Sequence, residues 1–317
     1  MTTPSPFTRL LVPLDGSPRS EESLPYALAL LSDAAEATIT ALHVVPDAEP
    51  LRRPLGQITK TADEVMAELT AEAQAELDAA VARSGAETMG VRVETVVRVG
   101  HVADTVLDVA DELAVDAVVM ASSGRGRVSR LALGSVADRV ARESTRPTLV
   151  VREHAVRQYE GDAAGAAPKI VRVVVPLDGS ERGLAALPLA AGIAAHLSAP
   201  VALVTAVEPA SAMGVASVGG AGFSAEMYGG LEEEVEAAAR EQLAEAEKRL
   251  AASGVAVTTD LLRGPAAGAI IAFATPADLI VMTSRGHGGL VRMVLGSVAD
   301  AIVREGPAPV LLVPSAE

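Results

Sequence analysis

Short apolar runs alternate with longer amphipathic segments along the first half of the chain, and this pattern predicts strands and helices in turn. Residues 10–12 form an apolar run that ends at a proline, which is typical of a buried strand leading into a loop. Ser17 then offers a helix N-cap and Pro18 a first helical position, and apolar residues follow at helical spacing over 24–31. We therefore expect a strand-to-helix unit at the start of the chain.

The rest of this half continues the alternation. Further strands are expected at 38–45, 91–99, 116–120 and 148–151, and further helices at 58–83, 102–113 and 135–142. The helix at 58–83 is rich in acidic side chains, which we assign to a solvated face. Five strands that alternate with four helices predict a parallel sheet with helices on both faces.

The second half of the chain repeats the first. The string PLDGS occurs at 13–17 and at 176–180, and the string LGSVAD occurs at 133–138 and at 295–300. The period of about 162 residues is far longer than the roughly 20 to 50 residues of solenoid repeats. The sequence therefore predicts a duplicated globular domain, with strands of the second copy at 172–175, 201–207, 256–262, 279–282 and 310–313.

We place the first domain at 1–152, a linker at 153–168 and the second domain at 169–317, because the segment between the copies has no core-forming pattern. The second copy departs from the first mainly in a glycine-rich segment at 211–230, which we expect to be a loop. Its composition is consistent both with a flexible lid and with a surface insertion.

Composition narrows the class of protein. Half of the residues are apolar but only 2% are aromatic, so the cores must be built from Val, Leu, Ile and Ala. The net charge of −15 argues against nucleic acid and against an anionic membrane as partners. The absence of cysteine excludes disulfides and thiol catalysis, and no apolar run reaches the length of a membrane span. We expect a cytoplasmic protein.

Both repeated strings fall at carboxyl ends of predicted strands, where open parallel sheets bind their ligands. The first string follows the first strand of each copy and brings Asp15 or Asp178 to this edge. The second string closes the loop after the fourth strand and starts the next helix at Ser135 or Ser297. Free N–H groups and the helix dipole at such a helix start attract anions, so these loops are candidate phosphate sites.

Plainer interpretations of these residues remain open. The segments Ser135–Asp138 and Ser297–Asp300 also fit a capping box, and Asp15 and Asp178 fit an Asx turn with the following Gly-Ser. The loop of the first copy also gathers three arginines, which either contact phosphate or keep the surface soluble; these are Arg125, Arg127 and Arg130.

The loops carry a resemblance to the universal stress protein family. Its ATP-binding members have a glycine, two residues, a glycine, nine residues, a glycine and then Ser or Thr. Both copies match the second glycine at Gly124 and Gly286, the nine-residue gap, and the third glycine with its serine, whereas Ala121 and Thr283 replace the first glycine. The chain resembles a tandem member, which implies two doubly wound five-stranded domains of the Rossmann-like, adenine nucleotide alpha-hydrolase-like fold.

The resemblance also implies the site residues. In the first copy the nucleoside would contact Asp15, with Pro13 and Leu14 beside it, while Val44 would meet the adenine and Ala121 the ribose. The phosphates would be held at the loop and the helix start, by Gly124, Gly134, Ser135 and Val136 with Arg125 and Arg127 beside them. The corresponding residues of the second copy are Pro176, Leu177, Asp178, Val207, Thr283, Gly286, His287, Gly296, Ser297 and Val298. The ligand would be ATP with Mg²⁺ or Mn²⁺, the metal being held by phosphates and not by protein side chains.

Binding rather than catalysis is the expected activity, with a nucleotide-dependent regulatory role in the stress response. The chain has no P-loop string, no dinucleotide-binding glycine string and no HExxH string, and its five histidines are scattered singly. The alternatives are a slow ATPase and an interaction scaffold with vestigial sites. The family resemblance further implies an internal pseudo-dimer of the two copies through their last strands and a possible homodimer, and we expect the first copy to bind more tightly.

Overall fold

The computed structural model describes residues 5–47, 61–122, 133–152, 168–208, 225–284 and 295–314, with side chains of the helix that begins at Ala225 described from 229 onward. The chain forms two compact units, one within Ser5–Pro168 and the other within Lys169–Glu317. The linker predicted at 153–168 lies outside the described residues except for Pro168. Each unit is described below by itself.

The N-terminal unit is a doubly wound parallel α/β domain. Its sheet has the order β3-β2-β1-β4-β5, and all of its strand pairs are parallel. The elements are β1 (Arg9–Pro13), α1 (Pro18–Glu21), α2 (Ser23–Leu30), β2 (Thr38–Pro46), α3 (Ala62–Arg83), β3 (Arg92–Gly100), α4 (Val102–Glu112), β4 (Ala117–Ala121), α5 (Ser135–Glu143) and β5 (Thr148–Val151). The chain winds outward from β1 to β3 and then returns to β4 on the other side of β1, which makes the gap between β1 and β4 the switch point.

The C-terminal unit repeats this topology, with the sheet order β8-β7-β6-β9-β10 and parallel pairs throughout. Its elements are β6 (Arg172–Pro176), α7 (Glu181–Leu184), α8 (Leu187–Leu197), β7 (Val201–Val207), α9 (Ala225–Leu250), η2 (Ala251–Ser253), β8 (Val257–Arg263), α10 (Ala266–Phe273), β9 (Asp278–Thr283), α11 (Ser297–Glu305) and β10 (Val310–Val313). The predicted duplication of a doubly wound domain is therefore confirmed.

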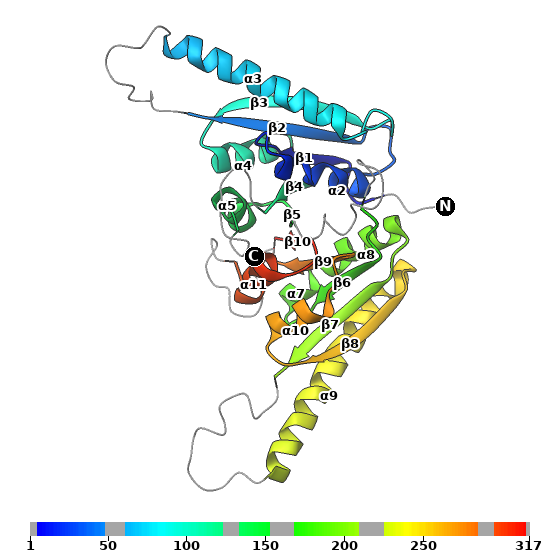
Figure 1. Ribbon diagram of the computed structural model, residues 1–317. Coiled ribbons are helices and arrows are strands. Elements are labelled where there is room, and N and C mark those ends of the chain that lie inside the picture. The colour runs from blue at the N-terminus through cyan, green and yellow to red at the C-terminus, as the bar shows by residue number, and fades with distance from the viewer. Residues whose placement is uncertain are drawn as a thin grey trace, which may run out of the picture. The chain divides into compact units, whose positions relative to one another are not determined.

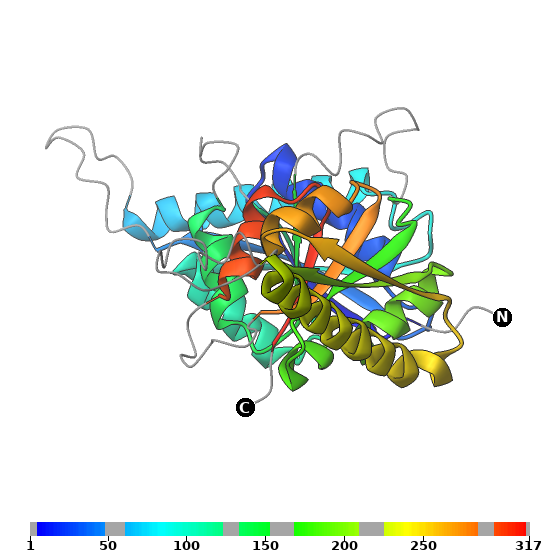
Figure 2. The ribbon, with the colours of Figure 1, turned by 90° about the horizontal axis from the view of Figure 1, so that it is seen from below.

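Helices cover the sheets in the same way in both units. Figure 1 shows α3 running along β2 and β3, and α9 along β7 and β8. In Figure 2 the yellow α9 and the orange α10 lie on opposite sides of the strands of the C-terminal unit. The central strands β4 and β9 are buried along their whole length, as expected for parallel strands covered on both faces. Among the described helices, none is both long and apolar enough to cross a membrane.

The helix expected after the first strand is divided in two in both units. In the first unit α1 ends at Glu21 and α2 begins at Ser23, and Pro25 lies four residues beyond Glu21. Proline has no N–H, so the carbonyl of Glu21 cannot accept the usual helical bond from residue 25. In the second unit α7 ends at Leu184, four residues before Pro188. The same missing donor therefore explains both divisions.

The loop prediction is wrong for the last six residues of 211–230, because α9 begins at Ala225 and includes Gly229 and Gly230. Glycine in a helix costs about 1 kcal/mol relative to alanine, which weakens the helix without stopping it. Residues 209–224 lie outside the described residues, so neither the lid nor the insertion is tested.

Candidate functional site

Each unit has a cavity at the carboxyl ends of its strands. The cavity of the N-terminal unit has a volume of about 350 Å³ and lies between the turn after β1, the end of β2 and the start of α5. The predicted site residues that the structure describes all line it: Pro13, Leu14, Asp15, Val44, Ala121, Gly134, Ser135 and Val136. Gly124, Arg125 and Arg127 lie outside the described residues.

The cavity of the C-terminal unit is larger, with a volume of about 640 Å³. It too is lined by every predicted residue that the structure describes: Pro176, Leu177, Asp178, Val207, Thr283, Gly296, Ser297 and Val298. Gly286 and His287 lie outside the described residues. Both repeated strings thus reach one cavity in each unit.

The aspartate that follows the first strand forms an Asx turn in both units. Oδ1 of Asp15 accepts hydrogen bonds from the backbone N–H of Ser17 at 3.0 Å and from its hydroxyl at 2.6 Å. Ser180 donates the same two bonds to Oδ1 of Asp178, at 3.0 and 2.6 Å. The intervening Gly16 and Gly179 have φ of 75° and 78°, which favours glycine. The Asx turn therefore fixes a carboxylate that also lines the cavity, so the two interpretations of this aspartate coexist.

The helix at the other side of the cavity begins one residue earlier than the capping-box interpretation requires. Gly134 is the N-cap of α5, its carbonyl accepts the first helical bond from Asp138 at 2.8 Å, and no side chain caps the helix. Asp138 instead accepts two bonds of 2.9 Å from Arg142. Gly296 caps α11 in the same way. The capping-box interpretation of Ser135 and Ser297 is therefore wrong, because both serines occupy the first helical position.

Hydrogen bonds fix both ends of the loop before this helix. The N–H of Gly134 donates to the carbonyl of Ser122 at 2.7 Å, and Ser122 N–H donates to Val151 at 2.8 Å. In the C-terminal unit Gly296 donates to Ser284 and Ser284 to Val313, both at 2.9 Å. The first N–H groups of an α-helix have no intrahelical partner. Because Gly134 N–H is engaged, the donors aimed at the cavity of the N-terminal unit are those of residues 135–137, all of which line it.

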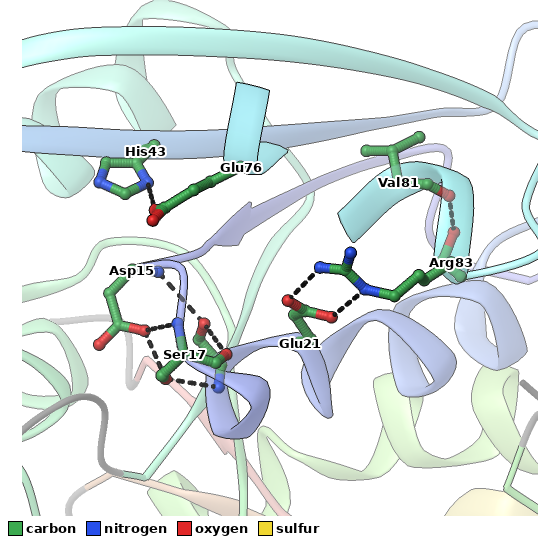
Figure 3. A network of polar contacts seen from close by, with 9 residues as sticks. Asp15, Ser17, Glu21, His43, Glu76, Val81 and Arg83 are labelled. Atoms are coloured by element: carbon green, nitrogen blue, oxygen red, sulfur yellow. Dashed lines mark hydrogen bonds and ion pairs between the residues drawn. The ribbon is translucent and has the colours of Figure 1, made fainter. Parts of the chain in front are cut away.

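The opposite end of the N-terminal cavity is largely apolar, with contributions from Val102, Val106 and Met120. His43 adds a polar group that the sequence-based prediction missed. It is 8% exposed, and its Nδ1 lies 3.9 Å from Oε2 of Glu76 on α3 (Figure 3). The available signal was a histidine inside the otherwise apolar end of the predicted strand at 38–45, directly before Val44.

Gln242 and Thr205 occupy the corresponding positions of the C-terminal unit. Leu14 N–H donates to Leu42, directly before His43, and Leu177 N–H donates to Val204, directly before Thr205, both at 2.8 Å. The buried Leu77 of α3 matches the buried Leu243 of α9, which aligns Glu76 with Gln242. Both Thr205 and Gln242 line the C-terminal cavity, and an added Cβ on Gly179 would meet the Gln242 side chain at 2.5 Å. The prediction also missed Thr205 and the residues that α9 contributes to this wall: Val235, Ala238 and Ala239.

In both units an ion pair joins the long helix, α3 or α9, to the short helix that follows the Asx turn, α1 or α7. Arg83 of α3 donates to Glu21 of α1 through Nε at 3.1 Å and Nη2 at 2.7 Å (Figure 3). Arg249 of α9 donates to Glu181 of α7 at 3.2 and 3.1 Å. The carboxylate hydrogen bonds raise the pKa of Arg83 and of Arg249 above the ordinary value. Both guanidinium groups therefore stay charged at ordinary pH.

The fold and these cavities define a class of protein: a duplicated doubly wound α/β domain with a ligand-sized cavity at each switch point. The model of the universal stress protein family matches residues 6–152 and again residues 169–314. The chain belongs to the universal stress protein family, as a tandem member.

Individual universal stress proteins are similar to this chain over one or both copies. A universal stress protein from Mycolicibacterium smegmatis is 27% identical over 312 residues, which cover 96% of each chain. The crystal structure of a universal stress protein from Archaeoglobus fulgidus has the same fold, with a TM-score of 0.64 and 20% identity over 98% of this chain and 97% of that chain. A universal stress protein solved in complex with cAMP is 26% identical, with a TM-score of 0.35, and covers 47% of this chain and 99% of that chain.

Proposed function

We propose that each unit binds one adenine nucleotide in its cavity and that nucleotide occupancy regulates the protein's contacts with its partners in the stress response. The observation that carries this proposal is the convergence, in both units, of a fixed carboxylate and a helix start without a side-chain cap on one cavity. A few polar groups at the edges of a mainly apolar cavity are typical of small-molecule sites.

The two ends of the cavity suit the two ends of a nucleotide. The phosphates would accept hydrogen bonds from the N–H groups of residues 135–137, where the helix dipole adds attraction for an anion. The base would contact Val44, Val102 and Val106, with Asp15 beside the ribose. Mg²⁺ or Mn²⁺ would be held by phosphate oxygens and water. Among the described residues, no three side chains of the metal-ligating types gather at one place.

In the C-terminal unit, regulation is favoured over hydrolysis by the chemistry of the described cavity wall. In the C-terminal cavity the one described acidic side chain is Asp178, whose Oδ1 is held by Ser180. Hydrolysis requires a positioned base next to the attacking water. The smaller cavity of the N-terminal unit supports the expectation of tighter binding there, because it encloses a ligand with less excess volume.

The test is calorimetry of the full chain with ATP and Mg²⁺, with variants that separate binding from folding. Aspartate at the first helical position stabilises a helix by about 0.3 to 1 kcal/mol but repels phosphate. Ser135→Asp should therefore abolish binding to the N-terminal cavity while it preserves thermal stability, and Ser297→Asp should do the same for the C-terminal cavity. Ser135→Asn and Ser297→Asn are the neutral controls. Absence of binding heat from folded wild-type protein at millimolar nucleotide would overturn the proposal.

A further inference from the structure

The two cavities differ in their titratable groups. In the N-terminal unit the wall contains His43, whose Nδ1 lies 3.9 Å from Oε2 of Glu76 (Figure 3). In the C-terminal unit the equivalent positions carry Thr205 and Gln242, neither of which has a side chain that titrates in the range of histidine. A proton can therefore be gained or lost at this place in one copy and not in the other.

We propose that nucleotide binding to the N-terminal cavity is linked to a proton on His43, whereas binding to the C-terminal cavity is not. The two copies would then report nucleotide with different responses to pH. This inference rests on the proposed function, because it concerns the same cavities and the same ligand. Histidine is suited to this role, since its ordinary titration range overlaps the pH range of cells.

The groups around His43 determine the sign of the linkage. Glu76 approaches it from α3, and Asp15 lies on the same cavity wall, after β1 (Figure 3). On β3 the residue paired with His43 is Val97, and the neighbouring Arg98 forms an ion pair of 3.6 Å with Glu112. The described wall residues from α4, β4 and α5 are uncharged: Val102, Val106, Met120, Ala121, Ser135, Val136 and Ala137.

Protonated His43 offsets the carboxylate of Glu76. When the imidazole loses its proton, the carboxylates of Asp15 and Glu76 remain at this end of the site, and both repel an anionic ligand. The affinity of the N-terminal cavity for nucleotide should therefore fall as the pH rises through the titration of His43. One unit of charge at this range, screened by solvent, corresponds to a change of about fivefold in affinity. Binding should be accompanied by proton uptake.

The experiment measures affinity and proton uptake on the full chain, by calorimetry with ATP and excess Mg²⁺ from about pH 5.5 to about pH 8, in buffers of different ionisation enthalpy. The Ser297→Asp variant isolates the N-terminal cavity, and the Ser135→Asp variant isolates the C-terminal cavity. We expect proton uptake and a fall of about fivefold in affinity in the first variant only. Protonation of ATP itself contributes equally to both variants and so cancels in the comparison.

Exchange of the residues between the cavities provides the matched test. His43→Thr with Glu76→Gln, introduced into Ser297→Asp, should lose the extra proton uptake and the dependence of affinity on the titration of His43. Thr205→His with Gln242→Glu, introduced into Ser135→Asp, should gain both. Binding in Ser297→Asp without extra proton uptake would overturn the inference and leave the proposed function intact. Absence of binding to the wild-type chain would overturn the proposed function and the inference together.

Discussion

Arg172 and Asp278 form a bidentate ion pair at the amino-terminal ends of β6 and β9. Nε and Nη2 of Arg172 donate to the carboxylate of Asp278 at 3.0 and 2.8 Å. Asp278 is 1% exposed and also accepts two bonds from Thr275, at 2.7 and 3.0 Å. The guanidinium lies 4.5 Å from the centre of the Phe273 ring. This pair lies at the opposite end of the strands from the cavity, so it affects stability independently of ligand binding.

Removal of the Arg172 guanidinium should leave the buried carboxylate of Asp278 without its charged partner. We expect Arg172→Leu to lower the free energy of unfolding by about 3 kcal/mol at neutral pH, because an uncompensated buried charge is costly. Part of that loss should be regained on acidification, as protonation removes the stranded charge. Denaturant unfolding as a function of pH measures both effects.

The wild-type pair should show no such pH dependence near neutrality. The hydrogen bonds that Asp278 accepts from Arg172 raise the pKa of Arg172, so the stabilisation that this shift represents is present below the ordinary arginine pKa and is lost only in strong alkali. Arg172→Lys, which keeps the charge but loses the planar fork, is the matched control and should cost about 1 kcal/mol. Equal stability of Arg172→Leu and wild type would contradict the prediction.

The Asx turn can be separated from the charge of its aspartate. Asp15→Asn retains an oxygen that accepts from Ser17, whereas Asp15→Ala loses both of these hydrogen bonds. We expect Asp15→Ala to lower the free energy of unfolding by about 1 kcal/mol and Asp15→Asn to lower it by less. Thermal unfolding tests the difference, and Asp178→Asn and Asp178→Ala repeat it in the C-terminal unit. Equal losses for the asparagine and alanine variants would refute a structural role of the turn.

The glycine N-caps allow a test of close ligand approach. Gly134 has φ of −63° and ψ of 149°, and Gly296 has φ of −60°, so alanine can adopt either backbone conformation without strain. We expect Gly134→Ala to leave thermal stability nearly unchanged but to weaken ATP binding to the N-terminal cavity about tenfold, because the new methyl group stands where phosphate approaches the helix start. Gly296→Ala should act in the same way on the C-terminal cavity. Unchanged affinity in the double variant would show that phosphate does not approach these residues.

The unexpected start of α9 gives a prediction about its glycines. Nothing lies within 4 Å of a Cβ added to Gly229 or Gly230, so alanine should strengthen this part of the helix by about 0.5 to 1 kcal/mol at each position. Slower amide hydrogen exchange near 225–235 would report the gain. Gly254 is the control: it also has open space around it, but its φ of 71° should make alanine destabilising.

The sequence predicted the parts of the fold that depend on local pattern. The pattern located each of the ten strands that the structure describes. Apolar runs located eight of them, because parallel strands covered on both faces are apolar throughout, whereas the partly exposed β3 and β8 carry charged and polar residues between the apolar ones. The sequence also predicted that the described candidate residues lie together at one edge of each sheet, because the repeated strings follow the carboxyl ends of strands. The division between α1 and α2 was also readable in principle, since Pro25 signals the missing donor.

The features that the sequence did not predict depend on contacts between distant segments or on the exact residue at which a helix begins. The sequence pattern of 38–45 does not indicate that Glu76 of α3 approaches His43, because that contact depends on how the helix packs on the sheet. The N-caps were misassigned by one residue. Ser135 fits the sequence pattern of an N-cap, but the residue at that position is Gly134, which has no side chain to signal it. The start of α9 was missed because the glycine content of 211–230 was interpreted as a loop, whereas the long helix that ends at Leu250 already includes Gly229 and Gly230.

The hydrogen bonds from Gly134 to Ser122 and from Gly296 to Ser284 close two rings of equal size, since each spans eleven intervening residues. Each of these two closing hydrogen bonds joins main-chain atoms of described residues, so the bond itself does not depend on which side chains the intervening residues carry. After the duplication, the two intervening sequences could therefore diverge, one toward arginine and the other toward glycine, without disturbing the sheet or the helix that follows. These main-chain hydrogen bonds let the side chains of the intervening residues change in evolution while the fold is maintained.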